Sequence, residues 1–114
     1  MSLRLAALCG AVFLLASLSV THAQTGIASI YAYSKEKTAN GETASPHTLT
    51  AAHRSLPFGT RVRITNKKNH HSVVVRINDR GPFVHGRIID VTPAAAKILG
   101  FSGLTPVSVE ITHG

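Results

Sequence analysis

The amino-acid sequence predicts a mainly β protein, a small barrel with one short helix. Short segments in which apolar and polar residues alternate recur along the chain, and turn residues separate them, which is typical of strands. Only one stretch carries the signals that start and stop a helix. The single cysteine, Cys9, lies near the N-terminus and there is no tryptophan, so the domain needs a compact core instead of disulfides. These observations favour a closed barrel or a sandwich over a loop-rich scaffold.

Residues 1–23 are predicted to be a secretory signal peptide. One early cation, Arg4, precedes an apolar run that ends in Thr21, His22 and Ala23, with small residues at the two positions that a signal peptidase inspects, so cleavage is expected near Ala23. The run of about 16 residues is shorter than the roughly 20 that a membrane-spanning helix needs. Leu8 before Cys9 makes a poor lipoprotein cleavage site. We therefore expect an exported, unlipidated protein of the periplasm or cell envelope, with residues 24–114 forming one domain.

Six segments of this domain are predicted to be strands, because each alternates or is rich in β-branched residues. In one of them Val62 and Ile64 point inward while Arg61 and Arg63 point outward. The predicted strands cover residues 26–34, 48–53, 60–66, 72–77, 87–91 and 106–112. The side chains expected in the core are Val62, Ile64, Val74, Ile77, Ile89, Leu99, Val107, Val109 and Ile111.

A single short helix is predicted over residues 94–99. Thr92 can cap its N-terminus, and Pro93 loses nothing at the first helical position, where the backbone N–H would be unpaired. Gly100 stands at the C-terminal end, where helices commonly adopt a left-handed residue. The helix therefore lies between the last two predicted strands.

The stretch SVVVRINDRGP, residues 72–82, is the first candidate for a functional site. Its β-branched run is typical of a packed strand, and turn residues end the run abruptly. A rigid strand that ends in a loop fixes a side chain while leaving room for a ligand, which singles out Asp79. Asp79 could equally cap the turn by accepting hydrogen bonds from backbone N–H groups. The stretch alone leaves both interpretations open.

The predicted domain is strongly basic. Without Arg4, eleven lysine and arginine residues face five acids, which leaves a net charge of +6. An exported protein of this charge suits an anionic partner outside the cytoplasm, such as a cell-wall polymer or a membrane surface. We expect no nucleic-acid partner, because of the compartment and because the few aromatic residues offer no stacking platform for single strands. We also expect a monomer, with no stable membrane insertion once the signal peptide is removed.

Six segments together resemble the rare lipoprotein A (RlpA) family, namely GIASIY, KTANGE, LTAAH, LPFGTRVRITN, SVVVRINDRGP and RIIDVTPAAAKILG. They follow the family's order and spacing over nearly the whole predicted domain. The resemblance implies a six-stranded double-psi β-barrel. It also implies an endolytic lytic transglycosylase that cleaves peptidoglycan glycan strands, preferably lacking stem peptides, to 1,6-anhydro-ended products in cell-wall remodelling or septation. A more distant similarity to expansins implies the alternative, a non-catalytic module that binds the polysaccharide.

The resemblance assigns catalytic function to Glu42, His53 and Asp79, which we expect to line one groove. A lytic transglycosylase protonates the glycosidic oxygen and lets the C6 hydroxyl of the same sugar attack, so one acid/base can suffice. Asp79 is the predicted acid/base, provided that Arg80 points away from it. Glu42 is predicted to position the substrate or to steady developing positive charge, and His53 to hydrogen-bond a carboxylate. The alternatives are an exposed loop glutamate and a packed histidine.

Residues predicted to bind the substrate are Asp90, Asn40, Arg80, Tyr31 and Phe83. Tyr31 and Phe83 are candidates for stacking on sugars, with core packing as the alternative for Tyr31. Asp90 stands two residues before Thr92, so a structural role at the helix entry is its alternative.

No metal or cofactor is predicted. The adjacent His70 and His71 would point apart on a strand or hairpin, and no cysteine follows residue 23. Beside an enzyme and an expansin-like module, a third possibility is a cationic structural protein of the wall. The binding of such a protein to an anionic polymer would depend strongly on salt.

Overall fold

The computed structural model of the chain describes residues 23–31 and 36–112. The predicted signal peptide lies outside these residues except for Ala23, the first residue of strand β1. Among the described residues, no helix has the length and apolar character needed to cross a membrane.

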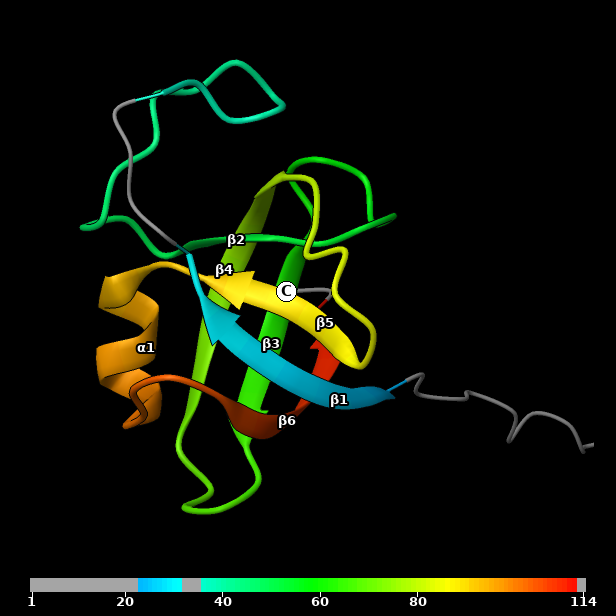
Figure 1. Cartoon of the computed structure of the whole chain (residues 1–114), viewed down its shortest axis with the longest axis vertical. Helices are drawn as coiled ribbons and strands as arrows, with labels where there is room; N and C mark the ends of the chain where they lie inside the picture. Colours follow the sequence, from blue (N-terminus) through cyan, green and yellow to red (C-terminus); the bar gives the residue numbers. More distant parts are fainter. Residues whose placement is uncertain (1–22, 32–35, 113–114) are drawn as a thin grey trace, which may run out of the picture.

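Six strands close into a barrel in the order β1-β5-β2-β4-β3-β6 (Figure 1). The strands are β1 (Ala23–Ile30), β2 (Thr50–Ala52), β3 (Arg61–Asn66), β4 (Ser72–Asp79), β5 (Arg87–Val91) and β6 (Thr105–Ile111). The pairs β1/β5 and β2/β4 are parallel, and the other neighbours are antiparallel. The predicted mainly β fold, a closed six-stranded barrel with a helix, is confirmed.

Five of the six strands differ in extent from the prediction. β3 differs by one residue at its start and β6 by one residue at each end, whereas β4 continues to Asp79, two residues past the predicted end at residue 77. β1 begins at Ala23, before the expected start at residue 26, because Ala23 already pairs with Glu110 near the end of β6. The predicted end of this strand, at residue 34, lies outside the described residues. β2 covers only Thr50–Ala52 of the expected 48–53.

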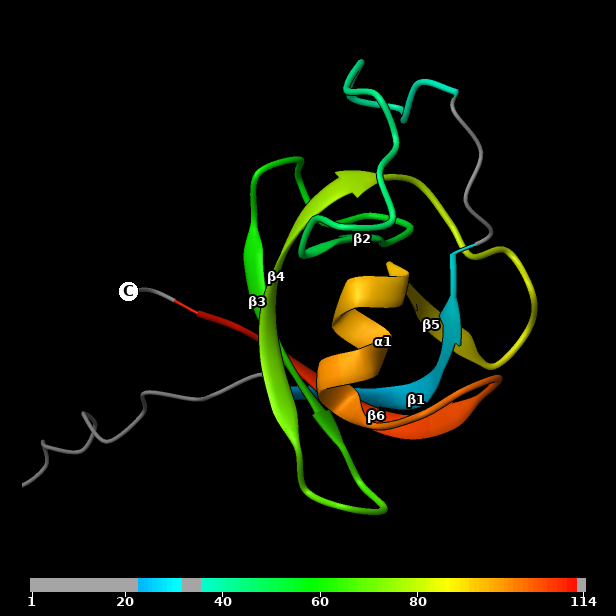
Figure 2. The same ribbon diagram turned by 90° about the vertical axis from the view of Figure 1, so that its left-hand side faces the viewer.

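Helix α1 (Pro93–Leu99) lies across one opening of the ring of strands (Figure 2). Its predicted cap is confirmed, because Thr92 Oγ1 accepts a hydrogen bond from the backbone N–H of Ala95. Gly100 ends the helix with φ of 75°, a conformation that glycine adopts without steric cost. The helix buries Leu99 and so closes this end of the core.

The core is formed by the inward residues of all six strands and α1. Seven of the nine side chains predicted to be inside are buried, and two predictions are wrong. Val74 is only half-buried, because Val73 and Val75 occupy the inner positions of β4. Ile111 is 43% exposed, because β6 ends there.

Candidate functional site

Two strands on either side of β2 bring Asp79 and Asp90 to the outer face of the barrel. The register of β2 against β4 shifts just before Ala52, which pairs with Asp79. Asn78 is the extra residue of this β-bulge, so Asp79 points outward, whereas strict alternation would turn it inward like Ile77. Ala52 pairs on its other side with Asp90. The two carboxylates therefore flank Ala52, with Cα atoms roughly 10 Å apart at the usual strand spacing.

The carboxylate of Asp79 accepts three hydrogen bonds. Oδ1 accepts from the backbone N–H groups of Ala39 and Arg80, both at 2.9 Å. Oδ2 accepts from the hydroxyl of Tyr31. Because two backbone donors occupy Oδ1, Oδ2 is the oxygen that can carry a proton. A hydroxyl can donate or accept, so Tyr31 can keep its contact with either form of Asp79.

Tyr31 is half-buried at the end of β1, where its hydroxyl stays protonated. Burial, together with the hydrogen bond to Asp79 and the charge of that carboxylate, raises the pKa of Tyr31 to about 12. The structure thus shows a polar role for this residue, and its stacking on sugars stays a prediction.

The loop of residues 36–46 carries Glu42 to the same end of β4. Arg76 donates from Nη1 to Oε2 at 2.6 Å and from Nη2 to Oε1 at 3.1 Å, and Asn78 Nδ2 donates to Oε1 at 3.1 Å. The hydrogen bonds, those from Arg76 first, lower the pKa of Glu42 from about 4.5 to about 2. Glu42 is therefore ionised at neutral pH and cannot act as a proton donor.

Asn40 shapes this loop from within. Its Oδ1 accepts from the hydroxyl of Thr38 at 2.7 Å and from the backbone N–H of Glu42 at 3.0 Å. Its Nδ2 donates to Glu42 Oε2 at 2.9 Å, and its backbone N–H donates to the carbonyl oxygen of Asn78 at 3.2 Å. The side chain of Asn40 is thus engaged with Glu42 in this conformation.

The ring of His53 is held by neutral partners. Nδ1 accepts hydrogen bonds from the backbone N–H groups of Ser55 and Leu56, at 3.1 and 3.2 Å, which places the ring hydrogen on Nε2. Nε2 then donates to Oε1 of Gln24 at 3.0 Å. Among the described residues, His53 makes no hydrogen bond to a carboxylate with its side chain.

His53 was expected to share a groove with Glu42 and Asp79, but its ring lines a different groove, beside Gln24. β2 ends at Ala52, and the ring of His53 turns to Gln24 on β1 and to the backbone of the loop after β2. The groove that His53 lines contains neither Glu42 nor Asp79. Burial first, and then the charges of nearby arginines, lower the pKa of His53, which keeps the ring neutral at pH 7. The packed-histidine alternative describes its position.

Arg80 points away from Asp79, as the proposed acid role requires. Nη1 donates to the carbonyl oxygens of His53 at 3.2 Å and Leu56 at 2.8 Å. The guanidinium carbon lies 4.0 Å from the centre of the Phe58 ring, in a cation–π contact. The side chain of Arg80 thus ties the loop after β2 to the end of β4.

Asp90 is half-buried beside β1. The hydroxyl of Ser29 donates to its Oδ1 at 3.1 Å. Burial raises the pKa of Asp90, while this hydrogen bond and the charge of Arg87 act in the opposite direction. The cap of α1 is made by Thr92 without the carboxylate of Asp90, so the structure gives no support to a role at the helix entry.

Phe83 offers an open aromatic ring near this site. It is 76% exposed and lies in the loop between β4 and β5, with its ring against Gly81. Val84, the next residue, is also exposed. An exposed ring beside polar groups is suited to a sugar face.

Sequence reasoning did not single out Arg76 and Asn78, which hold Glu42. Arg76 stands between the buried Val75 and Ile77, and a cation inside an apolar strand is a signal that could have identified it. Asn78 is buried as the bulge residue, and nothing in the sequence pattern reveals a bulge there.

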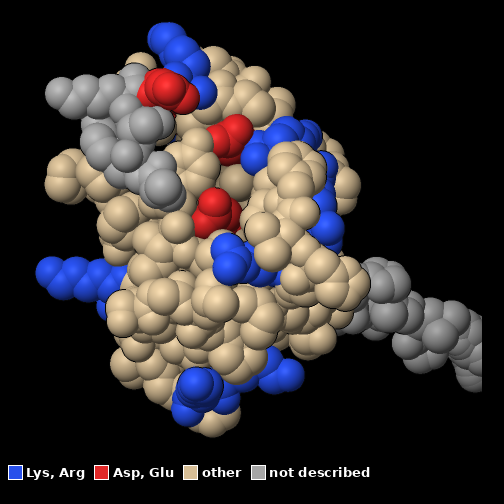
Figure 3. Space-filling model, viewed as in Figure 1, with Lys and Arg blue, Asp and Glu red and all other residues tan. Residues whose placement is uncertain are grey.

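The face seen in Figure 3 shows acidic side chains in a hollow with basic side chains on its sides. Within the described ranges, no group of three histidine, cysteine or acidic side chains is arranged to hold a metal ion. The site described above carries carboxylates, a tyrosine hydroxyl and arginines.

The fold and this face define a six-stranded β-barrel with a carboxylate site at the ends of its strands. Residues 23–111 match the family model described as lytic transglycolase. The chain belongs to this family, and the predicted resemblance is confirmed. A protein of Nostoc sp. named "Probable endolytic peptidoglycan transglycosylase RlpA" is 56% identical over 92 residues, which cover 75% of this chain and 25% of the relative.

Further relatives carry the same kind of name. A probable endolytic peptidoglycan transglycosylase RlpA of Synechocystis sp. is 50% identical, over 86% of this chain and 32% of the relative. The endolytic peptidoglycan transglycosylase RlpA of Campylobacter jejuni is 45% identical, over 82% of this chain and 36% of the relative. The chain thus spans between a quarter and two fifths of the length of these curated relatives.

Two solved structures share the fold. The Streptomyces papain inhibitor superposes with a TM-score of 0.63 at 20% identity, covering 81% of this chain and 96% of the inhibitor. An expansin of Clavibacter michiganensis also superposes with a TM-score of 0.63 at 20% identity, covering 81% of this chain and 51% of the expansin. The predicted six-stranded double-psi β-barrel is confirmed.

Proposed function

We propose that this chain is the catalytic domain of an endolytic lytic transglycosylase that cleaves peptidoglycan glycan strands, preferably those lacking stem peptides. Membership of the lytic transglycolase family and the names of its relatives support this proposal. The observation that carries it is the geometry of Asp79, whose Oδ1 is fixed by two backbone donors while Oδ2 meets a hydroxyl. We further propose that the protein is exported to the cell envelope and acts as a monomer.

In the proposed reaction, the proton on Oδ2 of Asp79 moves to the glycosidic oxygen as the bond from that oxygen to C1 breaks. Positive charge develops on C1 and the ring oxygen. The C6 hydroxyl of the same sugar then attacks C1, and the ionised Oδ2 takes the hydroxyl proton. The new bond closes the 1,6-anhydro ring, and Asp79 ends protonated as it began. No water molecule is consumed.

The neighbouring residues support this chemistry in different ways. Glu42, ionised and held by Arg76, supplies negative charge while positive charge develops on the sugar. Tyr31 keeps Oδ2 of Asp79 oriented through both protonation states. His53 holds the chain after β2 in place and takes no proton at neutral pH.

We propose that the substrate strand lies over the outer face that bears Asp79 and Asp90. Phe83, with its exposed ring, stacks on a sugar at one side of this face. Asp90 contacts sugar hydroxyls. Asn40 and Arg80 act on the substrate indirectly, since both side chains are engaged within the protein.

The substitution Asp79→Asn tests the proposal. Asparagine keeps an oxygen for the two backbone donors but cannot supply a proton, so the release of anhydro-ended fragments should fall by about 10²–10⁴-fold. Glycan binding should change little. The assay incubates wild type and variant with intact and amidase-stripped peptidoglycan, with products identified by mass spectrometry and folding checked by thermal unfolding.

A folded Asp79→Asn variant that still releases anhydro-ended fragments at the wild-type rate would contradict the assignment of Asp79. Wild-type protein that binds the glycan without releasing such fragments would instead indicate the expansin-like binding module. Binding that merely follows the salt concentration, with no preference for the glycan, would indicate a cationic structural protein.

A further inference from the structure

A second β-bulge places Arg87 on the face that carries the carboxylates. Between β1 and β5, Ile27 pairs with Arg87 and Ala28 pairs with Ile89, so Ile88 is an extra residue in β5. Without this residue, Arg87 and Asp90 would point to opposite faces, being three residues apart. With it, both point outward, about 7 Å apart along the strand. In agreement with this placement, the positive charge of Arg87 acts to lower the pKa of Asp90.

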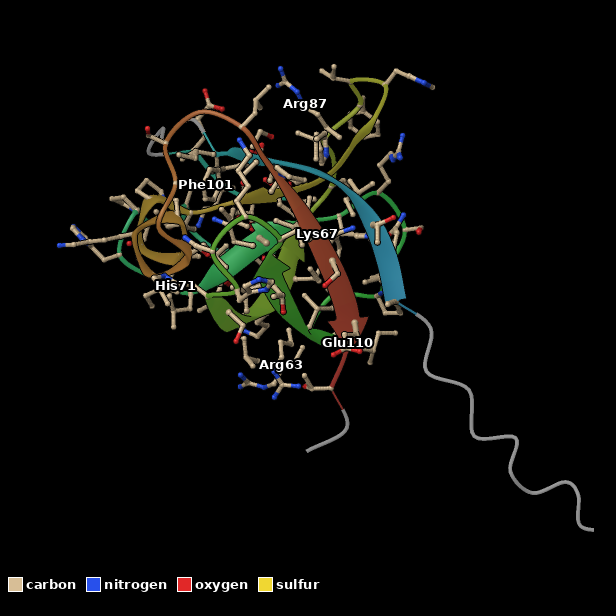
Figure 4. All side chains as sticks on the ribbon, turned by 90° about the horizontal axis from the view of Figure 1, so that it is seen from below. Arg63, Lys67, His71, Arg87, Phe101 and Glu110 are labelled. Atoms are coloured by element: carbon tan, nitrogen blue, oxygen red, sulfur yellow. The ribbon has the colours of Figure 1, made fainter. Side chains whose placement is uncertain are left out.

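Arg87 differs from the other arginines of the site in having no internal partner. Arg76 is paired with Glu42, and Arg80 is bound to two carbonyl oxygens and to a phenylalanine ring. The side chain of Arg87 makes no ion pair and no hydrogen bond with the described residues, which include all five acids of the chain. Figure 4 shows it reaching outward from the barrel.

The site therefore combines several carboxylates with the guanidinium of Arg87, which has no partner among the described residues. Carboxylates alone would repel an anionic substrate, whereas a guanidinium binds a carboxylate through two parallel hydrogen bonds. In a peptidoglycan glycan strand, every muramic acid carries a lactyl group whose carboxylate becomes free when the stem peptide is removed. This group occurs beside every second glycosidic bond, so it can mark the bond to be cut.

We propose that Arg87 binds the free lactyl carboxylate of the glycan strand and so makes the site select strands without stem peptides. This inference rests on the proposed function and names the residue that sets its substrate preference. The contact is made outside the group that transfers the proton, so it acts on substrate binding and leaves the chemical step unchanged.

The test compares two forms of amidase-stripped glycan, one with free lactyl carboxylates and one with the carboxylates converted to neutral methylamides. Wild type should bind the free form about 5–10-fold more tightly and cleave it with a KM lower by a similar factor. Arg87→Gln should lose this discrimination, with kcat little changed, whereas Arg87→Lys should restore part of it.

Arg63→Gln is the matched control. Arg63 is also an outward, exposed arginine, but it lies on β3, three places from β5 in either direction round the barrel. Figure 4 shows the two arginines on opposite sides of the molecule, Arg63 beside Glu110. The control removes the same charge, so it should retain the discrimination of the wild type.

Equal binding of both glycans by wild type, or an equal loss on both glycans in Arg87→Gln, would overturn the proposal. In the second case Arg87 would only tune Asp90, and the pH profile of kcat would shift as well. Co-sedimentation with the two glycans is measured apart from cleavage. If wild type cleaves neither glycan, the proposed reaction fails, while the binding comparison still decides the role of Arg87.

Discussion

The proposed proton transfer depends on the contact between the Tyr31 hydroxyl and Oδ2 of Asp79. The substitution Tyr31→Phe keeps the ring and its packing but removes the group that holds Oδ2. We expect kcat for the release of anhydro-ended fragments to fall on the order of 10-fold, which corresponds to one hydrogen bond of roughly 1.4 kcal/mol. The measurement is kcat and KM on amidase-stripped glycan.

The value of kcat separates the orienting role of Tyr31 from a stacking role. Phenylalanine retains a ring that can stack on a sugar, so a stacking role alone predicts that both kcat and KM remain at the wild-type values. An unchanged kcat in a folded Tyr31→Phe variant would therefore argue against the orienting role.

Individual residues of the site could be predicted from the sequence, whereas most of their partners could not. The end of an apolar run in turn residues singled out Asp79. Alternation permitted the Arg80 side chain to point elsewhere, which the acid role of Asp79 requires, and that side chain does point away from Asp79. The expected partner of His53 was a carboxylate, and the observed partner is Gln24. That contact depends on how β1 closes the barrel, which local sequence patterns do not encode.

Among the structural elements, the two β-bulges determine which side chains reach the outer face. Alternation predicted the strands correctly but, continued through a bulge, it inverts the facing of every later residue. Asp79 lies just beyond the bulge at Asn78, and Asp90 lies beyond the one at Ile88. The second bulge also requires a glycine opposite it. The side chain of the extra residue, Ile88, packs so closely on Gly26 that a Cβ there would lie 2.6 Å from Ile88 Cγ2.

The 36–46 loop is fastened to β4 by Glu42, which predicts a dependence of stability on pH. The pKa of Glu42 is about 2 in the folded protein and near 4.5 in the unfolded chain. The contribution of Glu42 to the free energy of unfolding is therefore complete above pH 4.5 and is lost as the pH falls towards 2. Because the side chains of Glu42 and Arg76 are 39% and 33% exposed, solvent screens the pair. We expect Glu42→Gln to lower the free energy of unfolding by about 1 kcal/mol at pH 7.

Urea unfolding of wild type and Glu42→Gln between pH 7 and pH 2 measures this contribution as the difference between the two curves, since the other carboxylates titrate in both. The difference should shrink through the window from pH 4.5 to pH 2. Arg76→Gln should remove the largest part of the same pH-dependent contribution, because it takes away the first cause of the lowered pKa while the hydrogen bonds from Asn78 and Asn40 remain. A difference that stays constant over this window would show that the ion pair does not fasten the loop.

For the whole molecule, the number and type of elements followed from periodicity, but the order of strands round the barrel did not. β1 lies between β5 and β6, and β2 lies between β4 and β5, so the neighbours are far apart in sequence. Such pairings come from closure of the sheet, which joins the first and last strands. Alternation likewise does not show where a strand leaves the core: Ile111 has the correct alternation for the core but is exposed because β6 ends there.

The cost of shortening an isoleucine should therefore depend on its place in the barrel. Ile64 is fully buried and pairs with Val109, whereas Ile111 pairs with Val62 and is 43% exposed. Ile64→Ala should lower the free energy of unfolding by about 2–5 kcal/mol, because it leaves a cavity that the close-packed barrel cannot fill. Ile111→Ala removes the same atoms from a partly solvated end of β6 and should cost about 1 kcal/mol or less. Urea unfolding at pH 7 measures both, and equal losses would mean that Ile111 belongs to the core after all.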